Sequence, residues 1–72
     1  MIDLDKIVNN WLLSLKNELE EYPSVFKKAE DLCGNNKYKE AYMLINNFMS
    51  ENELKQSDSY KEKDTDFFYG IH

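Results

Sequence analysis

Two short segments with apolar residues at helical spacing lie on either side of Gly34-Asn35-Asn36, near the middle of the chain. Residues three and four apart share one face of an α-helix, and glycine with asparagine favours a reversal of the chain. We therefore predict a helical hairpin, with helices over about 24–33 and 37–49. Its apolar faces are Val25, Phe26, Ala29, Leu32 and Cys33 in the first helix, and Tyr38, Ala41, Tyr42, Ile45, Phe48 and Met49 in the second.

The predicted ends of these helices follow from the residue types found there. Ser24 precedes the first apolar stripe and is a favourable N-cap residue. Gly34 is expected to take the left-handed conformation that closes the first helix, and Asn35-Asn36 to continue the turn. The hairpin is where the fold is specified, because its second helix has the cleanest stripe in the sequence.

A third helix is predicted over about 3–22. Its start can be capped by Asp3 or Asp5, and Pro23 should end it, because the residue before proline is driven out of the helical conformation. Leu13 lies about 100° outside the apolar stripe, so it is either covered by another segment or exposed. The stripe is expected to face the core, with a dimer seam as the alternative. Its members are Leu4, Ile7, Val8, Trp11, Leu12, Leu15, Leu19 and Tyr22.

Residues 51–72 differ in composition from the rest. Ser50 and Glu53 have the spacing of a capping box, so either a short helix from about Glu51 or a polar arm is expected. The aromatic cluster Phe67-Phe68-Tyr69 follows, and either folds back to close the core or binds a partner. The predicted fold is thus an all-α bundle of three helices, with a fourth as the alternative. Residues 1–50 form the helical domain, and 51–72 a polar arm or short helix with an aromatic end.

The hairpin resembles one tetratricopeptide unit. The resemblance rests on Ala29 and Leu32 in the first helix and on Tyr38-Lys39-Glu40-Ala41, Ile45 and Phe48 in the second, and covers about a third of the chain. It departs from that pattern at Asn36, where glycine is usual, and at Glu53, where proline is common. The resemblance implies hairpin geometry. The peptide-binding function of that family needs about three stacked copies, and no second copy is visible.

The charge of the chain restricts its partners. The 72 residues carry a formal net charge of −5, and all nine cations are lysine. Proteins that bind nucleic acids or anionic membranes use clustered basic side chains, and arginine is the main reader of guanine edges. We therefore expect no direct nucleic-acid contact and no membrane contact. A helix-turn-helix interpretation of the hairpin is disfavoured for the same reason, and a basic protein surface is the better electrostatic fit.

Residues that could support catalysis or metal binding are few. Cys33 is the only cysteine, so no intramolecular disulfide or cysteine-based zinc site is expected, and its place on an apolar face predicts an inert buried thiol. His72 is the only histidine, and both glycines are isolated. No enzyme activity, cofactor or metal is predicted. No apolar run is long enough to span a bilayer and the first residues do not resemble a secretory signal, so a cytoplasmic location is expected.

Two classes of function fit these observations. The first is a small cytoplasmic inhibitor, immunity or anti-defence regulator that occupies a basic surface on a larger protein, with a DNA-mimicking inhibitor as a narrower version. The second is an oligomerising or adaptor module, such as a homodimer. In the first class acids would steer association and aromatic rings would supply affinity. The residues predicted to contact a partner are Leu13, Glu18, Glu20, Glu21, Asp64, Asp66, Phe67, Phe68 and Tyr69.

Overall fold

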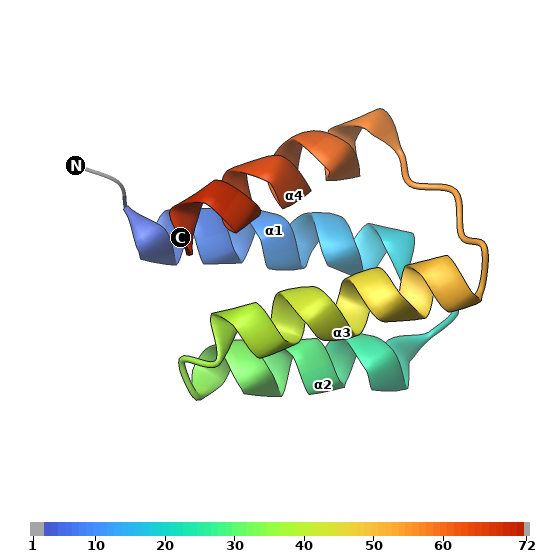
Figure 1. Ribbon diagram of the computed structural model, residues 1–72, viewed down its shortest axis with the longest axis horizontal. Coiled ribbons are helices and arrows are strands. Elements are labelled where there is room, and N and C mark those ends of the chain that lie inside the picture. The colour runs from blue at the N-terminus through green and yellow to red at the C-terminus, as the bar shows by residue number, and fades with distance from the viewer. Residues whose placement is uncertain (1–2, 72) are drawn as a thin grey trace.

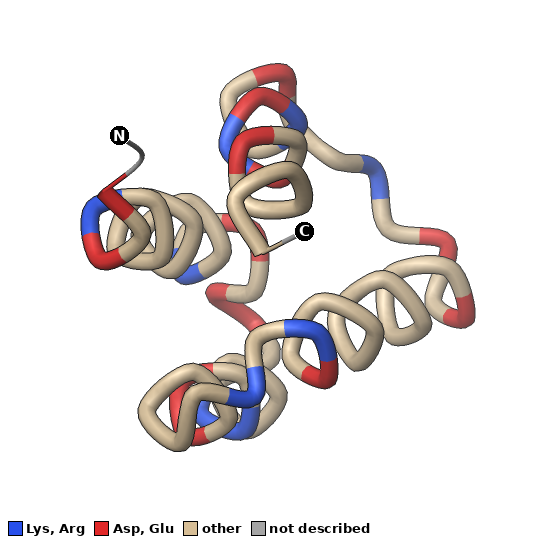
Figure 2. The backbone as a smooth tube through the Cα atoms, turned by 60° about the vertical axis from the view of Figure 1, so that its left-hand side comes forward, with Lys and Arg blue, Asp and Glu red and all other residues tan. Residues whose placement is uncertain are grey.

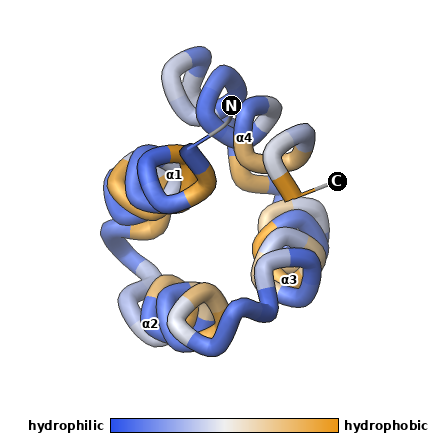
Figure 3. The backbone as a smooth tube through the Cα atoms, turned by 90° about the vertical axis from the view of Figure 1, so that its left-hand side faces the viewer, coloured by the Kyte–Doolittle hydropathy of each residue, from blue (hydrophilic) through white to orange (hydrophobic). Residues whose placement is uncertain are grey.

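The computed structural model describes residues 3–71, which fold into a bundle of four α-helices (Figure 1). Each helix runs antiparallel to the one before it, and the four surround a common core in chain order (Figure 3). The predicted all-α bundle is confirmed, and the fourth helix is present. Met1, Ile2 and His72 lie outside the described residues. The helices are α1 (Leu4–Glu18), α2 (Pro23–Gly34), α3 (Tyr38–Glu51) and α4 (Asp58–Gly70).

The core is filled by the apolar stripes predicted for the first three helices. The large side chains of Trp11, Leu15 and Ile45 are fully buried, and α4 adds Tyr60 and Phe67. Within residues 3–71 no helix has the length and apolar character needed to cross a membrane. The complete set of buried apolar residues is Val8, Trp11, Leu15, Leu19, Ala29, Cys33, Ala41, Ile45, Met49, Tyr60 and Phe67.

The first two helices begin differently. Asp3 caps α1 by accepting a hydrogen bond from the backbone N–H of Lys6 at 3.2 Å, which settles the choice between Asp3 and Asp5. The predicted cap at Ser24 is wrong. Tyr22 stands at the N-cap of α2 without a side-chain hydrogen bond, and Pro23 occupies the first turn. Proline is favourable there because the first N–H groups of a helix have no intrahelical partner.

α1 also ends earlier than predicted, at Glu18, which makes it about 22 Å long. Because Pro23 begins α2, the chain needs the preceding residues for the reversal between two antiparallel helices. Leu19 is the C-cap and remains buried, and Glu20 and Glu21 lie in the exposed turn. The reversal therefore takes residues from the end of α1.

α2 and α3 both end in Schellman motifs, and neither uses a glycine. At the end of α2 the N–H of Lys37 donates to Leu32 O, and the N–H of Asn36 to Cys33 O. Asn36 takes the left-handed conformation, with φ 61°, in place of Gly34, which is helical. The predicted role of Gly34 is therefore wrong, because the glycine lies two residues before the position that needs it.

The end of α3 repeats this pattern with Glu53, at φ 52°, in the left-handed position. The N–H of Leu54 donates to Met49 O, and the N–H of Glu53 to Ser50 O. The capping box predicted at Ser50 and Glu53 is therefore wrong, since these residues close a helix. The helix expected from Glu51 begins instead at Asp58, where Ser57 accepts a hydrogen bond from the N–H of Tyr60 at 3.1 Å.

α4 packs mainly against α1, and its aromatic end closes the core. Tyr60 and Phe67 are seven residues apart, so they lie on one face two turns apart. The ring of Phe67 stacks on Trp11 with 4.1 Å between centroids and 5° between planes. It also meets the rings of Tyr38 and Tyr42 of α3, at 6.4 and 6.2 Å. Phe67 thereby joins α4 to two other helices.

Candidate protein-interaction surface

α3 and α4 together present an apolar surface that the core does not use. We call Tyr42, Met43, Phe68, Tyr69 and Ile71 the α3–α4 face. Four of them, with Lys39 at the edge, line a shallow pocket of about 200 Å³. The C-terminal end of α4 lies next to α3 in Figure 3, which explains why residues far apart in the sequence meet here.

The face is both aromatic and accessible. The ring of Phe68 contacts Tyr42 at 5.2 Å on one side and Tyr69 at 5.5 Å on the other. Met43 and Tyr69 are 61% and 69% exposed, and Leu13 on α1, at 65%, is the other large apolar residue exposed among the described residues. Of these three, Met43 lines the pocket and Tyr69 contacts the lining residue Phe68, whereas Leu13 lies on a different helix. Aromatic and methionine side chains are enriched at protein interfaces.

The outer side of α4 carries a row of acids. Asp58, Glu62 and Asp66 are each four residues apart and exposed, and we call them the acidic ridge. Residues at this spacing are neighbours on a helix, and each like-charge pair costs about 0.2–0.5 kcal/mol. Tyr69 follows Asp66 by three residues, so the ridge leads to the α3–α4 face. In Figure 2 charged residues follow one another along α4, and its last turn is uncharged.

Glu18 has a structural role at the other end of α4. Its Oε1 accepts hydrogen bonds from the N–H of Ser57, at 3.2 Å, and from the Ser57 hydroxyl. Ser57 is the N-cap of α4, so the Glu18 carboxylate lies near the positive end of that helix dipole. This contact joins the end of α1 to the start of α4, and it engages a carboxylate that was predicted to contact a partner.

Asp64 lies beneath the surface, in a polar cluster between α1 and α4. Its Oδ1 accepts hydrogen bonds from Trp11 Nε1 at 3.3 Å and from the Tyr60 hydroxyl at 3.2 Å. Burial raises the pKa of Asp64 above its ordinary value of 3.8, although hydrogen bonds from Trp11, Tyr60 and Tyr42 act in the opposite direction. Burial and the neighbouring Asp64 carboxylate likewise raise the pKa of Tyr60. The indole N–H of Trp11 and the hydroxyl of Tyr60 thus each have a hydrogen-bond acceptor, although their rings are buried in the core.

Replacing Asp64 with asparagine should stabilise the protein at neutral pH. A folded-state pKa above the unfolded value gives stability that is present below about pH 3.8 and is lost as the pH rises through the folded-state pKa. The amide keeps an acceptor oxygen without the charge. The free energy of unfolding of Asp64→Asn minus that of the wild type should thus be positive at pH 7 and decline toward pH 4, as measured by urea unfolding.

Asp66→Asn is the matched control, because Asp66 is an exposed carboxylate two residues further along the same helix. It should stay within about 0.5 kcal/mol of the wild type over the same pH range. An Asp64→Asn variant that is less stable than the wild type at pH 7 would show that the cluster favours the carboxylate anion. That result would contradict the raised pKa of Asp64.

Cys33 has the environment of an unreactive thiol, as predicted. It is buried between α1 and α2, and burial, reinforced by the charge of Glu30, raises its pKa to about 11. The thiolate is the reactive form of cysteine, so little of it is present at pH 7. Within residues 3–71 no three histidine, cysteine, aspartate or glutamate side chains gather where they could hold a metal ion.

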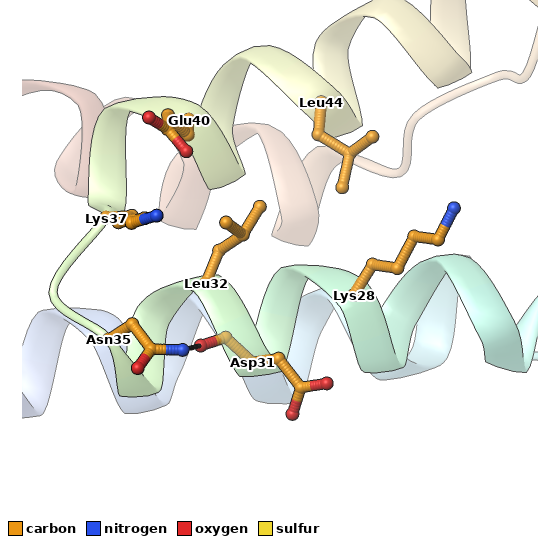
Figure 4. Close-up of a pocket in the computed structure, with 7 residues that line it drawn as sticks. All are labelled: Lys28, Asp31, Leu32, Asn35, Lys37, Glu40 and Leu44. Atoms are coloured by element: carbon orange, nitrogen blue, oxygen red, sulfur yellow. Dashed lines mark hydrogen bonds between the residues drawn. The ribbon is translucent and has the colours of Figure 1, made fainter.

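A second groove runs along the outer side of the α2–α3 hairpin (Figure 4). Leu32 and Leu44 extend into the space between the two helices, and Lys28, Lys37 and Glu40 lie at its edges. Asn35 Nδ2 donates to the carbonyl oxygen of Asp31 at 2.9 Å, which belongs to the turn. Charges of both signs surround this groove without converging on one point, so it has the character of an ordinary seam between packed helices.

The residues predicted to contact a partner lie at different depths in the structure. Phe67 was predicted to contact a partner. It is instead a core residue, because its ring is fully buried and stacks on Trp11. Glu18 and Asp64 are partly buried and hold structural hydrogen bonds. The structure brings Phe68 and Tyr69 together and places Asp66 one turn away. The exposed members of the predicted set are Leu13, Glu20, Glu21, Asp66 and Tyr69.

Sequence reasoning did not find the α3 half of this surface. Lys39, Tyr42 and Met43 belong to the hairpin, and none of them was among the residues predicted to contact a partner. Met43 directly follows Tyr42 and lies outside the apolar stripe of α3, which was the available signal. The four-residue spacing of the acidic ridge was a second signal, but it becomes meaningful only if residues 58–66 are helical.

Comparisons with protein families, with curated proteins and with solved structures find no significant match to this chain.

Proposed function

We propose that this chain is a small protein-binding protein that occupies a basic surface on a larger protein, as inhibitors, immunity proteins and anti-defence regulators do. The observation that carries the proposal is the acidic ridge of α4, which leads to the exposed ring of Tyr69 on the α3–α4 face. Acidic groups accelerate encounter with a basic partner, and desolvated aromatic rings supply binding energy. Glu20 and Glu21 add two exposed carboxylates in the turn that follows α1, whose last residue, Glu18, contacts Ser57.

Neither the acidic ridge nor the exposed apolar side chains are explained by a contribution to the stability of the fold. The two like-charge pairs of the ridge weaken α4 slightly, and Met43 and Tyr69 leave apolar area in water. Neither feature contributes to the core, whose large side chains come from other positions. A binding role explains why the ridge and the exposed ring of Tyr69 share the outer side of α4.

Affinity capture from the source cell tests the proposal with two charge-matched variants. Glu62→Lys/Asp66→Lys reverses two ridge charges, and Glu30→Lys/Asp31→Lys makes the same change in net charge at exposed positions of α2. The wild type and the α2 variant should retain the same protein at low salt, and the ridge variant should lose it. Because exposed charges are screened by ions, raising the salt concentration should release the partner. Equal capture by the ridge variant, or capture insensitive to salt, would contradict the proposal.

An oligomerising module is the second candidate, favoured by the exposure of Met43 and Tyr69 on one face. Sedimentation equilibrium of the full chain at micromolar concentration distinguishes the two. A stable dimer without a captured partner supports the second candidate, and a monomer that captures a basic protein supports the first.

A further inference from the structure

We propose that a pocket between α1, α2 and the start of α3 binds a small organic cation, an ammonium group carried on an apolar body. This inference goes beyond the proposed function and uses neither the acidic ridge nor the α3–α4 face. The pocket lies at the end of the bundle where α1 and α3 begin and α2 ends (Figure 1). The α1–α2 pocket, as we call it, is lined by Asp5, Val8 and Leu12 of α1, by Glu30, Cys33 and Gly34 of α2, and by Tyr38.

The α1–α2 pocket has the size and the mixed lining of a small-molecule site. Its volume is about 490 Å³, within the roughly 300–1,000 Å³ usual for ligand pockets. Val8, Leu12 and Tyr38 supply apolar surface, and Asp5 and Glu30 contribute one carboxylate from each of two helices. A ligand with both an apolar body and a polar group therefore matches this lining.

The charges of the α1–α2 pocket favour a cation. Asp5 and Glu30 are the charged lining residues among those described, and both are acids. Lys6 follows Asp5, and Lys27 comes three residues before Glu30, but neither lysine lines the pocket. The groove along the α2–α3 hairpin, by contrast, is lined by lysines and acids together. Two carboxylates without a lysine between them attract a positively charged ligand.

The floor of the α1–α2 pocket holds a polar group that the fold leaves unpaired. Cys33 is only 6% exposed and lines the pocket, and its thiol makes no hydrogen bond within residues 3–71. The charge of Glu30 contributes to the raised pKa of this thiol, so the carboxylate lies near the sulfur. Sulfur is a weak acceptor, and an ammonium group has three donors. An ammonium ion in the pocket thus has both the Glu30 carboxylate and the Cys33 sulfur as acceptors.

Gly34 keeps the mouth of the α1–α2 pocket open, and the fold does not require a glycine there. Gly34 is helical, and a Cβ added to it would meet no atom outside its own helical turn within 4 Å. A Cβ added to Gly70 would lie 3.1 Å from Cδ1 of Ile7, so close packing explains that glycine. Glycine has a lower helix propensity than alanine. Space for a ligand therefore explains the missing side chain at Gly34.

The test is an NMR titration of the full chain with benzylammonium chloride at pH 7. Benzyl alcohol is the control, because it has the same shape without the charge. Benzylammonium should bind at least about fivefold tighter than the alcohol. In ¹H–¹⁵N spectra the shifted amides should lie at residues 5–12 and 30–34. Equal binding of the alcohol, or shifts along the acidic ridge instead, would overturn the inference.

Variants of the lining separate this pocket from general attraction to an acidic protein. Asp5→Asn/Glu30→Gln removes both carboxylates and should weaken benzylammonium binding about fivefold. Asp31→Asn/Glu40→Gln makes the same change in net charge at the hairpin groove and should leave binding unaltered. Gly34→Leu fills the mouth of the pocket and should weaken binding at least about tenfold. Equal losses in the two charge variants would overturn the inference.

Two further measurements complete the test. Gly34→Leu should melt cooperatively and at no lower temperature than the wild type, because the added side chain meets open space. Unchanged binding in this folded variant would overturn the inference. Nα-acetyl-lysine methylamide carries the ammonium group of a protein lysine. Weaker binding of this compound than of benzylammonium supports a free ligand, and tighter binding overturns it in favour of a lysine side chain of a protein.

Discussion

Replacing Phe67 with alanine is expected to abolish the folded state or leave it marginal. The Phe67 side chain is fully buried, stacks on Trp11 and meets two further rings from α3. Removing a buried phenylalanine costs about 3–5 kcal/mol, and a core of this size supplies only roughly 3–5 kcal/mol of stability. Thermal unfolding followed by circular dichroism should lose its cooperative transition or shift down by more than about 12 °C.

Tyr69→Ala is the matched control for Phe67→Ala. It removes an aromatic ring two residues away on the same helix, but the side chain of Tyr69 is mostly exposed. Its free energy of unfolding should stay within about 0.5 kcal/mol of the wild type. The single tryptophan, Trp11, gives an independent signal, because its fluorescence should shift toward that of a solvated indole only in Phe67→Ala. A cooperative melt at the wild-type temperature for Phe67→Ala would contradict the packing described for α4.

The contrast between α3 and α4 explains how much of this fold the sequence could predict. α3 has a complete apolar stripe, including Ala41, Ile45 and Met49, so its existence and buried face were both predicted. The inward side of α4 and its C-cap carries buried Tyr60 and Phe67 and half-buried Asp64 and Ile71, with spacings of four, three and four. An aspartate inside that series interrupts the apolar pattern. Its half-buried position against the core depends on Trp11 and Tyr60 as hydrogen-bond donors, and these contacts are visible only in three dimensions.

The ends of the helices could likewise be predicted only where they depend on residues close together in the sequence. The cap of α1 depends on residues within one turn of each other, and Asp3 was one of the two candidates that the sequence predicted. Asn36 and Glu53 take left-handed conformations although glycine is the usual residue there. A glutamate in that conformation costs about 1–2 kcal/mol, which the surrounding packing must offset. Residue type alone therefore did not locate these ends.

The candidate surface was only half predictable for the same reason. Phe68 and Tyr69 were noticed because aromatic residues at a polar chain end are unusual, but the sequence could not show which ring faces inward. Tyr42 and Met43 join them only because α4 returns to lie beside α3. A surface built from residues as far apart in the sequence as Tyr42 and Phe68 requires the tertiary arrangement before it can be recognised.

Replacing Ile45 with lysine should prevent cooperative folding. Ile45 is completely buried at the centre of the α3 stripe, and no charged side chain is buried among the described residues. The substitution removes about 2 kcal/mol of apolar burial, and placing an ammonium group in the core costs several kcal/mol more. Together these exceed the roughly 3–5 kcal/mol available to a core of this size. Urea titration monitored by circular dichroism should show no cooperative transition.

Asn47→Lys is the control for Ile45→Lys, because it adds the same charge to the exposed side of the same helix. It should unfold cooperatively, within about 0.5 kcal/mol of the wild type. This pair separates the effect of burial from that of added charge, since lysine reduces the net negative charge equally in both variants. A normal cooperative transition in Ile45→Lys would mean that α3 does not face the core as described, and the α3–α4 face would then have to be reassigned.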